Sequence, residues 1–375
     1  MRRARLNGHI LTPGLVLAVL AWSGQARGQA MSQEAAVGRA LGRHPLIEAA
    51  GQGARAADAR VKQAQTGWLP RIRIEGGYQY AGPQQRLSMT VQPSILPDPI
   101  EINREIGTVH NASVGVSVAW RVYDFGARDV TTKAARAAAA AARAQGKERE
   151  AELAYAVRAA YLAALFFEEV ERVTERSLGV ARREEAEEKL KRKAGLGSDL
   201  DLARVATRVA QLEARLTEAR QERGRAMTAL GLLLGLGAAS GLRLTDSLEG
   251  LAAAPAGPGP KRHPTRLRLE ALKEASEHQL SAQWRSYFPT LDLMASLKYQ
   301  YPKNYFENDR AGLFYAAGLM LTWNVFDGDL LRRQRAETRA RVAELDGLAR
   351  ASGEEATRQA TDARARRLSA VAAAE

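Results

Sequence analysis

The sequence predicts a mainly α-helical fold with some β-structure, in which long coiled-coil helical hairpins accompany four membrane β-strands in each chain. Three observations predict it: an ordered pattern that occurs twice, long segments with helical periodicity, and four short segments of strict alternation. Because four strands cannot enclose a lumen, and an open sheet in lipid would leave unpaired edges, we expect the chain to oligomerise, and three copies would give 12 strands.

The duplicated pattern has four parts. Each copy contains an Arg-His-Pro triplet, an aromatic-x-Pro or aromatic-Pro segment whose proline stands 26 positions after that histidine, a Tyr-Gln-Tyr triplet, and an aromatic segment that ends in aspartate. The copies occupy residues 43–45, 68–70, 78–80 and 120–124, and residues 262–264, 287–289, 299–301 and 323–327. A repeated order of helix, two strands and long helix favours a channel built from a tandem repeat over a globular enzyme.

Residues 1–30 have the composition of a secretory signal peptide. Arg2, Arg3 and Arg5 precede an apolar stretch over residues 10–22, and small residues end two candidate cleavage sites, at 24–26 and 28–30. A membrane anchor is the alternative, but the apolar run is shorter than the ~20 residues that span a bilayer. We therefore expect export from the cytoplasm.

The composition excludes several classes of function. The chain has no cysteine, which rules out disulfides, thiolate catalysis, thiolate metal sites and a lipid-modified N-terminal cysteine. The formal charge is +13, or +9 without the four arginines of residues 1–30. A basic protein can bind nucleic acid, but arginine and glutamate are interspersed here, as at 182–185, which is typical of solvated coiled-coil faces. We expect no nucleic-acid partner.

Three segments carry helical signals. Residues 32–66 place Pro45 where a first helical turn tolerates it. Residues 127–194 lack proline and form a helix of roughly 100 Å at ~1.5 Å per residue. Ser198 then caps a third helix that ends near Leu234. The two shorter helices together match the length of the long one, so we expect them to stack end to end against it.

Four segments alternate strictly between apolar and other residues: 71–80, 112–122, 290–301 and 313–325. Their lengths suit tilted membrane strands of ~9–11 residues, and aromatic residues lie near their ends. A soluble sandwich with one wet face is the alternative. The turn-rich residues 81–111 and 302–312 are expected to be surface loops. The side chains that we expect to face lipid are Val114, Val116, Val118, Trp120, Leu319, Leu321 and Trp323.

Taken together, these residues resemble the TolC-like outer membrane efflux proteins over roughly residues 35–375. The resemblance rests on the signal peptide, the two copies of helix, hairpin and long helix, the Trp-x-Val-aromatic-Asp strand end, and the Gly-Leu-Gly-Ser-Asp-Leu segment at 195–200. It implies a homotrimer with a 12-stranded barrel in the outer membrane of a Gram-negative bacterium and a helical tunnel across the periplasm. It also implies a periplasmic adaptor (membrane fusion) protein, and through it an inner-membrane pump, as partners.

The resemblance assigns one partner-binding site. In the family, the turn between the long helix and its return helix faces the adaptor, and here this tip comprises Gly195, Leu196, Gly197, Ser198, Asp199 and Leu200. An ordinary helix-turn-helix corner capped by Ser198 is the alternative, and the two roles are compatible.

The domain order that follows is a signal peptide at 1–30, a first repeat at 31–249, a linker at 250–260 and a second repeat at 261–375. One departure from the family is large. Gly126 stands 71 positions before Gly197, and the same step from Gly328 reaches position 399, beyond Glu375. We therefore expect the second repeat to lack its tip, its return helix and the gating residues that the family carries there.

No catalytic, metal or cofactor site is expected. The five histidines have no ligand spacing, and no nucleophile, paired-carboxylate or phosphate-loop motif is placed convincingly. The sequence therefore predicts a passive exit duct of a tripartite efflux or type I secretion system, for small molecules or proteins. The alternatives are a truncated, non-functional duct paralogue and a periplasmic adaptor or coiled-coil structural protein of an efflux system.

Overall fold

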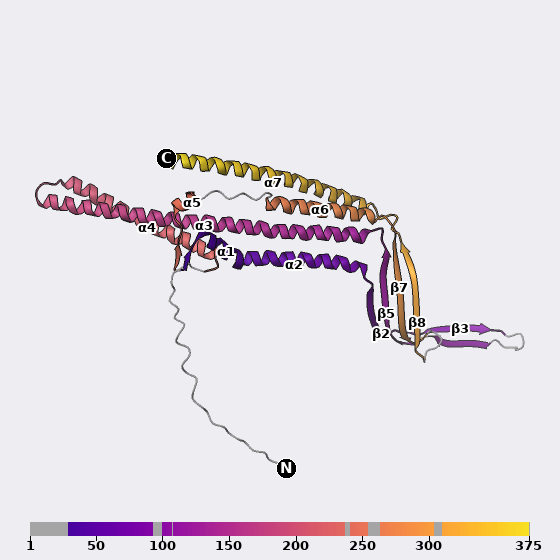
Figure 1. Cartoon of the computed structure of the whole chain (residues 1–375). Coiled ribbons are helices and arrows are strands. Elements are labelled where there is room, and N and C mark those ends of the chain that lie inside the picture. The colour runs from indigo at the N-terminus through magenta and orange to yellow at the C-terminus, as the bar shows by residue number, and fades with distance from the viewer. Residues whose placement is uncertain are drawn as a thin grey trace, which may run out of the picture. The chain divides into compact units, whose positions relative to one another are not determined.

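The computed structural model describes residues 29–92, 100–106, 108–236, 241–253, 263–303 and 310–374. The chain divides into two compact units. We name them the sheet unit (Leu46–Arg149 and Pro258–Glu375) and the tip unit (Met1–Pro45 and Glu150–Gly257). One helix, α3 (Ala127–Lys193), contributes to both (Figure 1). The predicted signal peptide falls almost entirely outside the described residues.

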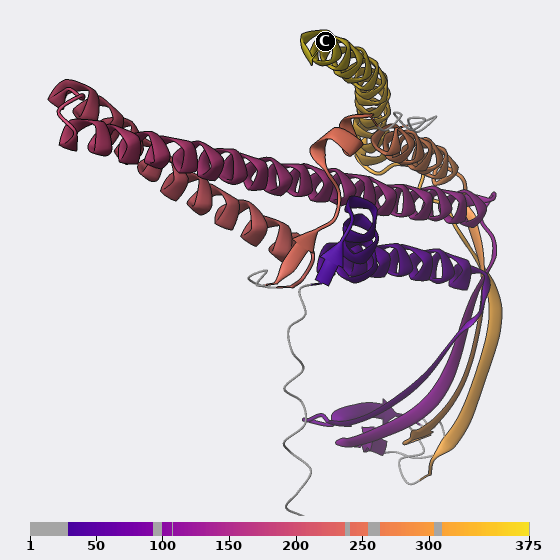
Figure 2. The same cartoon turned by 60° about the vertical axis from the view of Figure 1, so that its left-hand side comes forward.

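The sheet unit is built on one antiparallel sheet with the strand order β2-β5-β7-β8. Figure 2 shows its long strands bowed along their length. The four strands are β2 (Arg71–Tyr80), β5 (His110–Tyr123), β7 (Thr290–Tyr301) and β8 (Gly312–Thr322). Two of the four strands, β2 and β7, match the alternating segments to the residue. The strand β5 extends the predicted segment 112–122 by two residues at its start and one at its end, and β8 begins one residue before 313 and ends three residues before 325.

The prediction of a plain loop over residues 81–111 was wrong. This segment contains a second antiparallel hairpin, β3 (Gln85–Val91) with β4 (Ile100–Ile106). Its pairs alternate, so that Met89 and Ile102 lie on one face while Arg86 and Glu105 form an ion pair of 3.1 Å on the other. Residues 93–99 lie outside the described part, so the connection between its strands is not characterised.

The predicted helix over 32–66 is divided in two. After α1 (Gln33–Arg43), His44 takes an extended conformation, and α2 (Pro45–Gln65) begins at the proline. The pyrrolidine ring of Pro45 disfavours the helical conformation of the preceding residue, which explains the break. Pro264 starts α6 (Pro264–Arg285) in the same way, after an extended His263.

In the sheet unit, α6 packs side by side with α7 (Leu330–Ala374) (Figure 1). A small apolar core of Leu269, Leu345 and Ala349 joins the two helices. Lys273 Nζ and Asp346 Oδ1 add an ion pair of 2.8 Å beside it. Apart from the inserted hairpin β3–β4, the order of helix, two strands and helix occurs twice, with α2, β2, β5 and α3 in the first copy and α6, β7, β8 and α7 in the second.

A buried ion pair joins β5 to α3. Arg128 Nε lies 2.8 Å from Asp124 Oδ2, and the two side chains are 11% and 4% exposed. The carboxylate also accepts the backbone N–H groups of Gly126 and Arg128. The guanidinium donates to the carbonyls of Gly67, Arg121 and Val122, and it lies 4.2 Å from the ring centroid of Trp68. We call this cluster the first corner.

The tip unit contains the rest of α3 and its antiparallel partner α4 (Asp199–Leu233). Leu178, Ala181, Val209 and Leu216 form their apolar seam. Cross-helix ion pairs flank this seam, including Arg182–Glu213, Arg220–Glu175 and Arg223–Glu171.

Two very short strands were not predicted: β1 (Gln29–Met31) and β6 (Leu242–Leu244) pair in parallel. Beside them, the fully buried Tyr161 donates its hydroxyl to the Met31 carbonyl at 2.9 Å. In the predicted linker, residues 250–253 belong to α5 (Leu248–Ala253), and residues 254–260 lie outside the described part.

Replacing Arg128 by methionine is expected to destabilise the protein by about 3 to 5 kcal/mol, because a buried carboxylate would remain without its counter-ion. The matched control is Lys133→Met, which breaks the exposed i,i+4 pair of Lys133 with Asp129 one turn further along α3 and should cost less than about 1 kcal/mol. Thermal unfolding followed by circular dichroism measures both. Equal losses would contradict the role of the first corner.

Glu148 provides a second test, at the contact between α3 and α6. Its carboxylate accepts hydrogen bonds from Thr265 Oγ1 at 2.6 Å and from Arg268 Nε at 2.7 Å. Burial raises the pKa of Glu148, but these hydrogen bonds and the Arg268 charge outweigh it, so the pKa lies below its usual value. The stabilisation is therefore present above the unfolded-state pKa and is lost as the pH falls through the folded-state pKa.

We expect Glu148→Gln to lower the free energy of unfolding at pH 7 by about 1.5 kcal/mol, and to have a smaller effect once the pH falls below the lowered folded-state pKa of Glu148, where the wild-type carboxyl group is neutral too. Unfolding by urea at a series of pH values measures this difference. Glu270→Gln, in an exposed pair with Arg266, is the control and should change little at any pH. A Glu148→Gln effect that is independent of pH would contradict the assignment.

Candidate functional site: a two-faced sheet and a helical tip

The strand register places most apolar side chains of the four strands on one face, which we call the apolar face, while Met294, Phe314 and Met320 lie on the other. Directly paired residues share a face of a sheet. Val116 pairs with Ile74 on one side and with Leu297 on the other, and Leu297 pairs with Tyr315. The next rows repeat this order, for example with Leu293 opposite Leu319.

The opposite face, which we call the polar face, carries every charged lysine, arginine, aspartate and glutamate side chain of these four strands. It has four cationic residues and two acidic ones: Arg71, Arg73, Arg121 and Lys298, with Glu75 and Asp292. Both acidic residues are paired, Glu75 with Arg73 at 3.2 Å and Asp292 with Arg121 at 3.0 Å. Small residues such as Gly115, Ser117 and Ser296 separate them.

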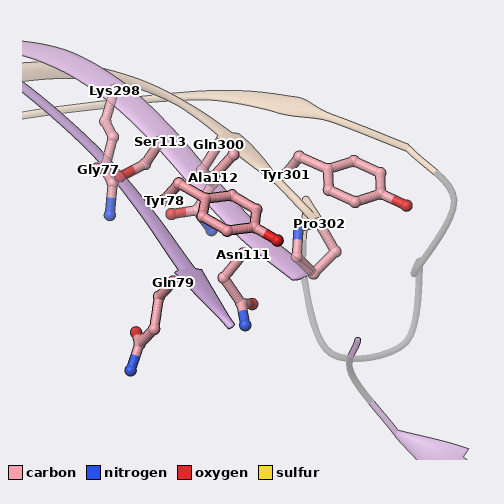
Figure 3. Close-up of a pocket in the computed structure, with 10 residues that line it drawn as sticks. All are labelled: Gly77, Tyr78, Gln79, Asn111, Ala112, Ser113, Lys298, Gln300, Tyr301 and Pro302. Atoms are coloured by element: carbon pink, nitrogen blue, oxygen red, sulfur yellow. The ribbon is translucent and has the colours of Figure 1, made fainter. Parts of the chain in front are cut away.

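The polar face is hollowed in several places. Figure 3 shows one hollow of about 360 Å³, where Lys298 and Gln300 of β7 lie near Gln79 of β2 and Asn111 of β5. A second hollow of about 370 Å³ adjoins it and shares Lys298. A third, of about 320 Å³, lies near the first corner and is lined by Arg71, Arg121, Arg128 and Asp292 among others.

Aromatic side chains stand at both ends of the sheet. At the end away from the helices, Tyr78 and Tyr80 contact the ring of His110, and Tyr78 Oη lies 2.8 Å from His110 Nδ1. At the helix end, the Trp120 indole donates to the Trp68 carbonyl and the Trp323 indole donates to the Tyr287 carbonyl, both at 3.0 Å. These two contacts occupy matching places in the two repeats.

The tip turn is shaped by two glycines. Gly195 has φ +77°, and the N–H groups of Gly195 and Leu196 donate back to the carbonyls of Arg192 and Lys191. This is the Schellman arrangement that ends a helix with glycine. At Gly197, a Cβ atom would lie 2.9 Å from the backbone nitrogen of Arg192. Both positions therefore require glycine.

The other side of the tip turn starts α4. Ser198 is its N-cap and accepts the Leu200 N–H at 3.2 Å, while Asp199 forms an ion pair of 2.6 Å with Arg192 across the turn. Leu196 and Leu200 project into solvent, with 83% and 58% of their surface exposed. The tip therefore combines a rigid backbone with exposed leucines.

The sequence profile of the family described as outer membrane efflux protein matches residues 36–236. The chain belongs to this family. Its members are channels rather than enzymes, and the family places this protein in the outer membrane. Among curated protein sequences, none matches the chain significantly.

Solved structures of outer-membrane channels share the fold. CusC superposes with a TM-score of 0.70 at 15% identity, covering 89% of this chain and 75% of CusC. VceC of Vibrio cholerae gives 0.66 at 18% identity, covering 88% and 77%. The open state of MtrE from Neisseria gonorrhoeae gives 0.64 at 15% identity, covering 86% and 70%. These likenesses confirm the predicted mainly helical fold with some β-structure.

In this outer membrane efflux protein, the residues predicted to face lipid are brought together only in part. Val114, Val116, Val118 and Trp120 lie on the apolar face with Leu319 and Leu321. Trp323 follows the end of β8, and its indole is held by the Tyr287 carbonyl. The six predicted tip residues are contiguous in the turn, but they lie in the tip unit.

Sequence reasoning missed two groups. The buried Asp124–Arg128 pair of the first corner could have been found from its i,i+4 spacing after a strand end. The excess of cationic over acidic residues on the polar face could have been recognised from the alternation of each strand alone, but it was also overlooked. The described residues contain no cluster of metal-binding side chains, and none of their helices is apolar over a length that would cross a membrane.

Gly195→Ala is expected to destabilise the tip by about 1 to 2 kcal/mol, because an L side chain is strained at this positive φ. Gly197→Ala should also destabilise, since its Cβ would collide with the Arg192 backbone. The control is Gly179→Ala within α3, where no atom lies within 4 Å of the added Cβ, and where alanine should stabilise by about 1 kcal/mol. Thermal unfolding of the three variants measures these changes in stability. If the two tip variants were stabilised as the Gly179→Ala variant is, the requirement for glycine at the tip would be contradicted.

Proposed function

We propose that this protein is the exit duct of a tripartite efflux or type I secretion system and that it passively exports small molecules or proteins across the outer membrane. Three copies of the four-stranded sheet close a 12-stranded barrel, and the helices continue it as a tunnel into the periplasm. The observation that carries the proposal is the segregation of the sheet into an apolar face and a face with all six lysine, arginine, aspartate and glutamate side chains.

The exposure of the apolar face supports a lipid environment. Ile74, Leu319 and Tyr315 are 74%, 65% and 85% exposed, and in the described residues no helix of the sheet unit covers these side chains. A soluble sandwich would bury such a face against a second layer. Left in water, it would exceed the apolar patches that soluble monomers expose. If lipid covers the apolar face and water covers the polar face, the apolar side chains need neither a second layer of protein nor contact with water.

The two open edges support a closed ring of copies. Within the described part of the chain, β2 pairs only with β5, and β8 pairs only with β7. Free backbone groups at these edges cannot remain unpaired in lipid. Because the two edges are different strands, β8 of one copy would join β2 of the next, a head-to-tail contact that generates a ring. Two copies give eight strands, whose interior side chains fill, and three are the smallest number that leaves a lumen.

The tip supports a docking role. Its exposed Leu196 and Leu200 stand on a backbone fixed by Gly195, Gly197 and the Ser198 cap. A pre-organised turn loses little conformational entropy on binding. We assign residues 195–200 as the contact for a periplasmic adaptor protein, which in turn connects to an inner-membrane pump. The residues that we assign to the lipid contact are Val114, Val116, Val118, Trp120, Leu319, Leu321 and Trp323.

Single-cysteine labelling tests the membrane placement. The chain has no cysteine, so Ser296→Cys on the polar face and Ala317→Cys on the apolar face would each create the only thiol. Both side chains are exposed in the single chain, so a difference must come from the surroundings. In outer-membrane vesicles we expect a membrane-impermeant maleimide to label the Ser296→Cys variant at least tenfold faster, and detergent denaturation to remove the difference.

The mass of the detergent-solubilised protein, measured by light scattering, is expected to equal three copies. Monomers in the periplasm, with both thiols labelled equally, would overturn the duct and favour a coiled-coil structural protein.

A further inference from the structure

The polar face has an excess of positive charge. Its four cationic and two acidic residues give a net charge of +2 for each chain. The pairs Arg73–Glu75 and Arg121–Asp292 use both carboxylates. Within the described residues, the remaining two cations, Arg71 and Lys298, form no ion pair. The excess is therefore attributable to two identified side chains.

Lys298 stands where its charge is accessible. It lies in one row with Glu75 and Gly115, and Gly115 pairs with both of them across the sheet. Gly115 leaves no side chain between the two, and a Cβ there would come within 2.9 Å of the Leu297 carbonyl oxygen. The adjoining hollows of about 360 and 370 Å³ both include Lys298. Glu75, which is paired with Arg73, also lines the second, and most of the other lining residues are small or uncharged.

Arg71 stands at the helix end of the same face. The hollow of about 320 Å³ there is lined by three arginines, Arg71, Arg121 and Arg128, and by one carboxylate, Asp292. Arg128 is neutralised by Asp124 and Arg121 by Asp292. The unpaired charge of this hollow is therefore that of Arg71. The hollows near Lys298 and the hollow near Arg71 thus each contain one unpaired positive charge.

We propose that the polar face is an anion-favouring lining, and that the duct therefore passes small anionic solutes in preference to cationic ones of the same size. The inference rests on the proposed function, which turns this face toward water inside a ring of copies. Three copies would bring six excess cationic side chains together around one lumen. A passage lined by one sign of charge raises the local concentration of oppositely charged solutes.

The test uses the Ser296→Cys reporter, two positions from Lys298 on the same face of β7. Its rate of reaction is measured with an anionic and with a cationic methanethiosulfonate reagent, each divided by the rate with free 2-mercaptoethanol, which has no charged group besides its thiolate. The same thiolate attacks both reagents, so any change in the thiol pKa cancels in the ratio. We expect the anionic reagent to be favoured.

Adding Lys298→Gln should lower the anionic-to-cationic ratio about twofold to fivefold at 0.1 M salt, given ~7 Å between such positions and a screening length of ~10 Å. Lys298→Glu should lower it further. Lys298→Arg, which keeps the charge, and Lys193→Gln, which removes a charge in the last turn of α3, should leave it unchanged. In planar bilayers, the double variant Arg71→Gln, Lys298→Gln should shift the reversal potential in the direction of a higher permeability to cations relative to anions.

A ratio equal to that of 2-mercaptoethanol, or one that Lys298→Gln does not move, would overturn the inference while the duct stands. The failure of the duct gives a different result, because the Ala317→Cys thiol would then react as readily as the Ser296→Cys thiol in membranes. A Ser296→Cys thiol that reacts with neither reagent would show that the polar face does not meet water, which overturns the inference as well.

Discussion

The sheet unit depends on how an extended strand is converted into a helix without leaving polar groups unsatisfied. At the first corner, a single carboxylate and a single guanidinium do this. Asp124 receives the first N–H groups of the turn and of α3, and Arg128 donates to carbonyls at the end of β5 and in the turn before β2. Because both side chains are buried, each compensates the desolvation of the other. The start of α3 is thereby fixed to the end of β5 and to the turn before β2.

The second repeat reaches the same geometry with different residues. Asp327 accepts the Leu331 N–H at 2.9 Å, as Asp124 accepts that of Arg128. Both turns also have two consecutive residues with positive φ, Phe125 and Gly126 in the first repeat and Gly328 and Asp329 in the second. Leu331 occupies the place of Arg128, so the second corner has no guanidinium at this position. Arg335, one turn further along α7, places its own guanidinium over the rings of Trp284 and Tyr287. Both corners therefore share the backbone turn and the aspartate that accepts from it, whereas the arginine that makes the cation–π contact lies one turn later in the second repeat.

The regular elements could be predicted because each has a periodic pattern of its own. Period-two alternation located β2 and β7 to the residue, and the absence of proline located α3. The helix break at His44 followed from a local rule at Pro45 that was not applied. The hairpin β3–β4 was hidden by the prolines around it, which indicated turns. The pairing of β1 with β6 could not be predicted, since three-residue strands more than 200 positions apart leave no periodic signal.

The two faces of the sheet also constrain each other. In a closed ring with the apolar face in lipid, the polar faces converge, and their like charges come closer together than in the single chain. The pairs Arg73–Glu75 and Arg121–Asp292 reduce four cations to an excess of two in each chain. Across a water-filled lumen, where two charges even ~4 Å apart interact by only ~1 kcal/mol, that remaining repulsion is small. In the ring that we propose, the paired arginines therefore lower the repulsion on closure, and the unpaired Arg71 and Lys298 set the sign of its interior.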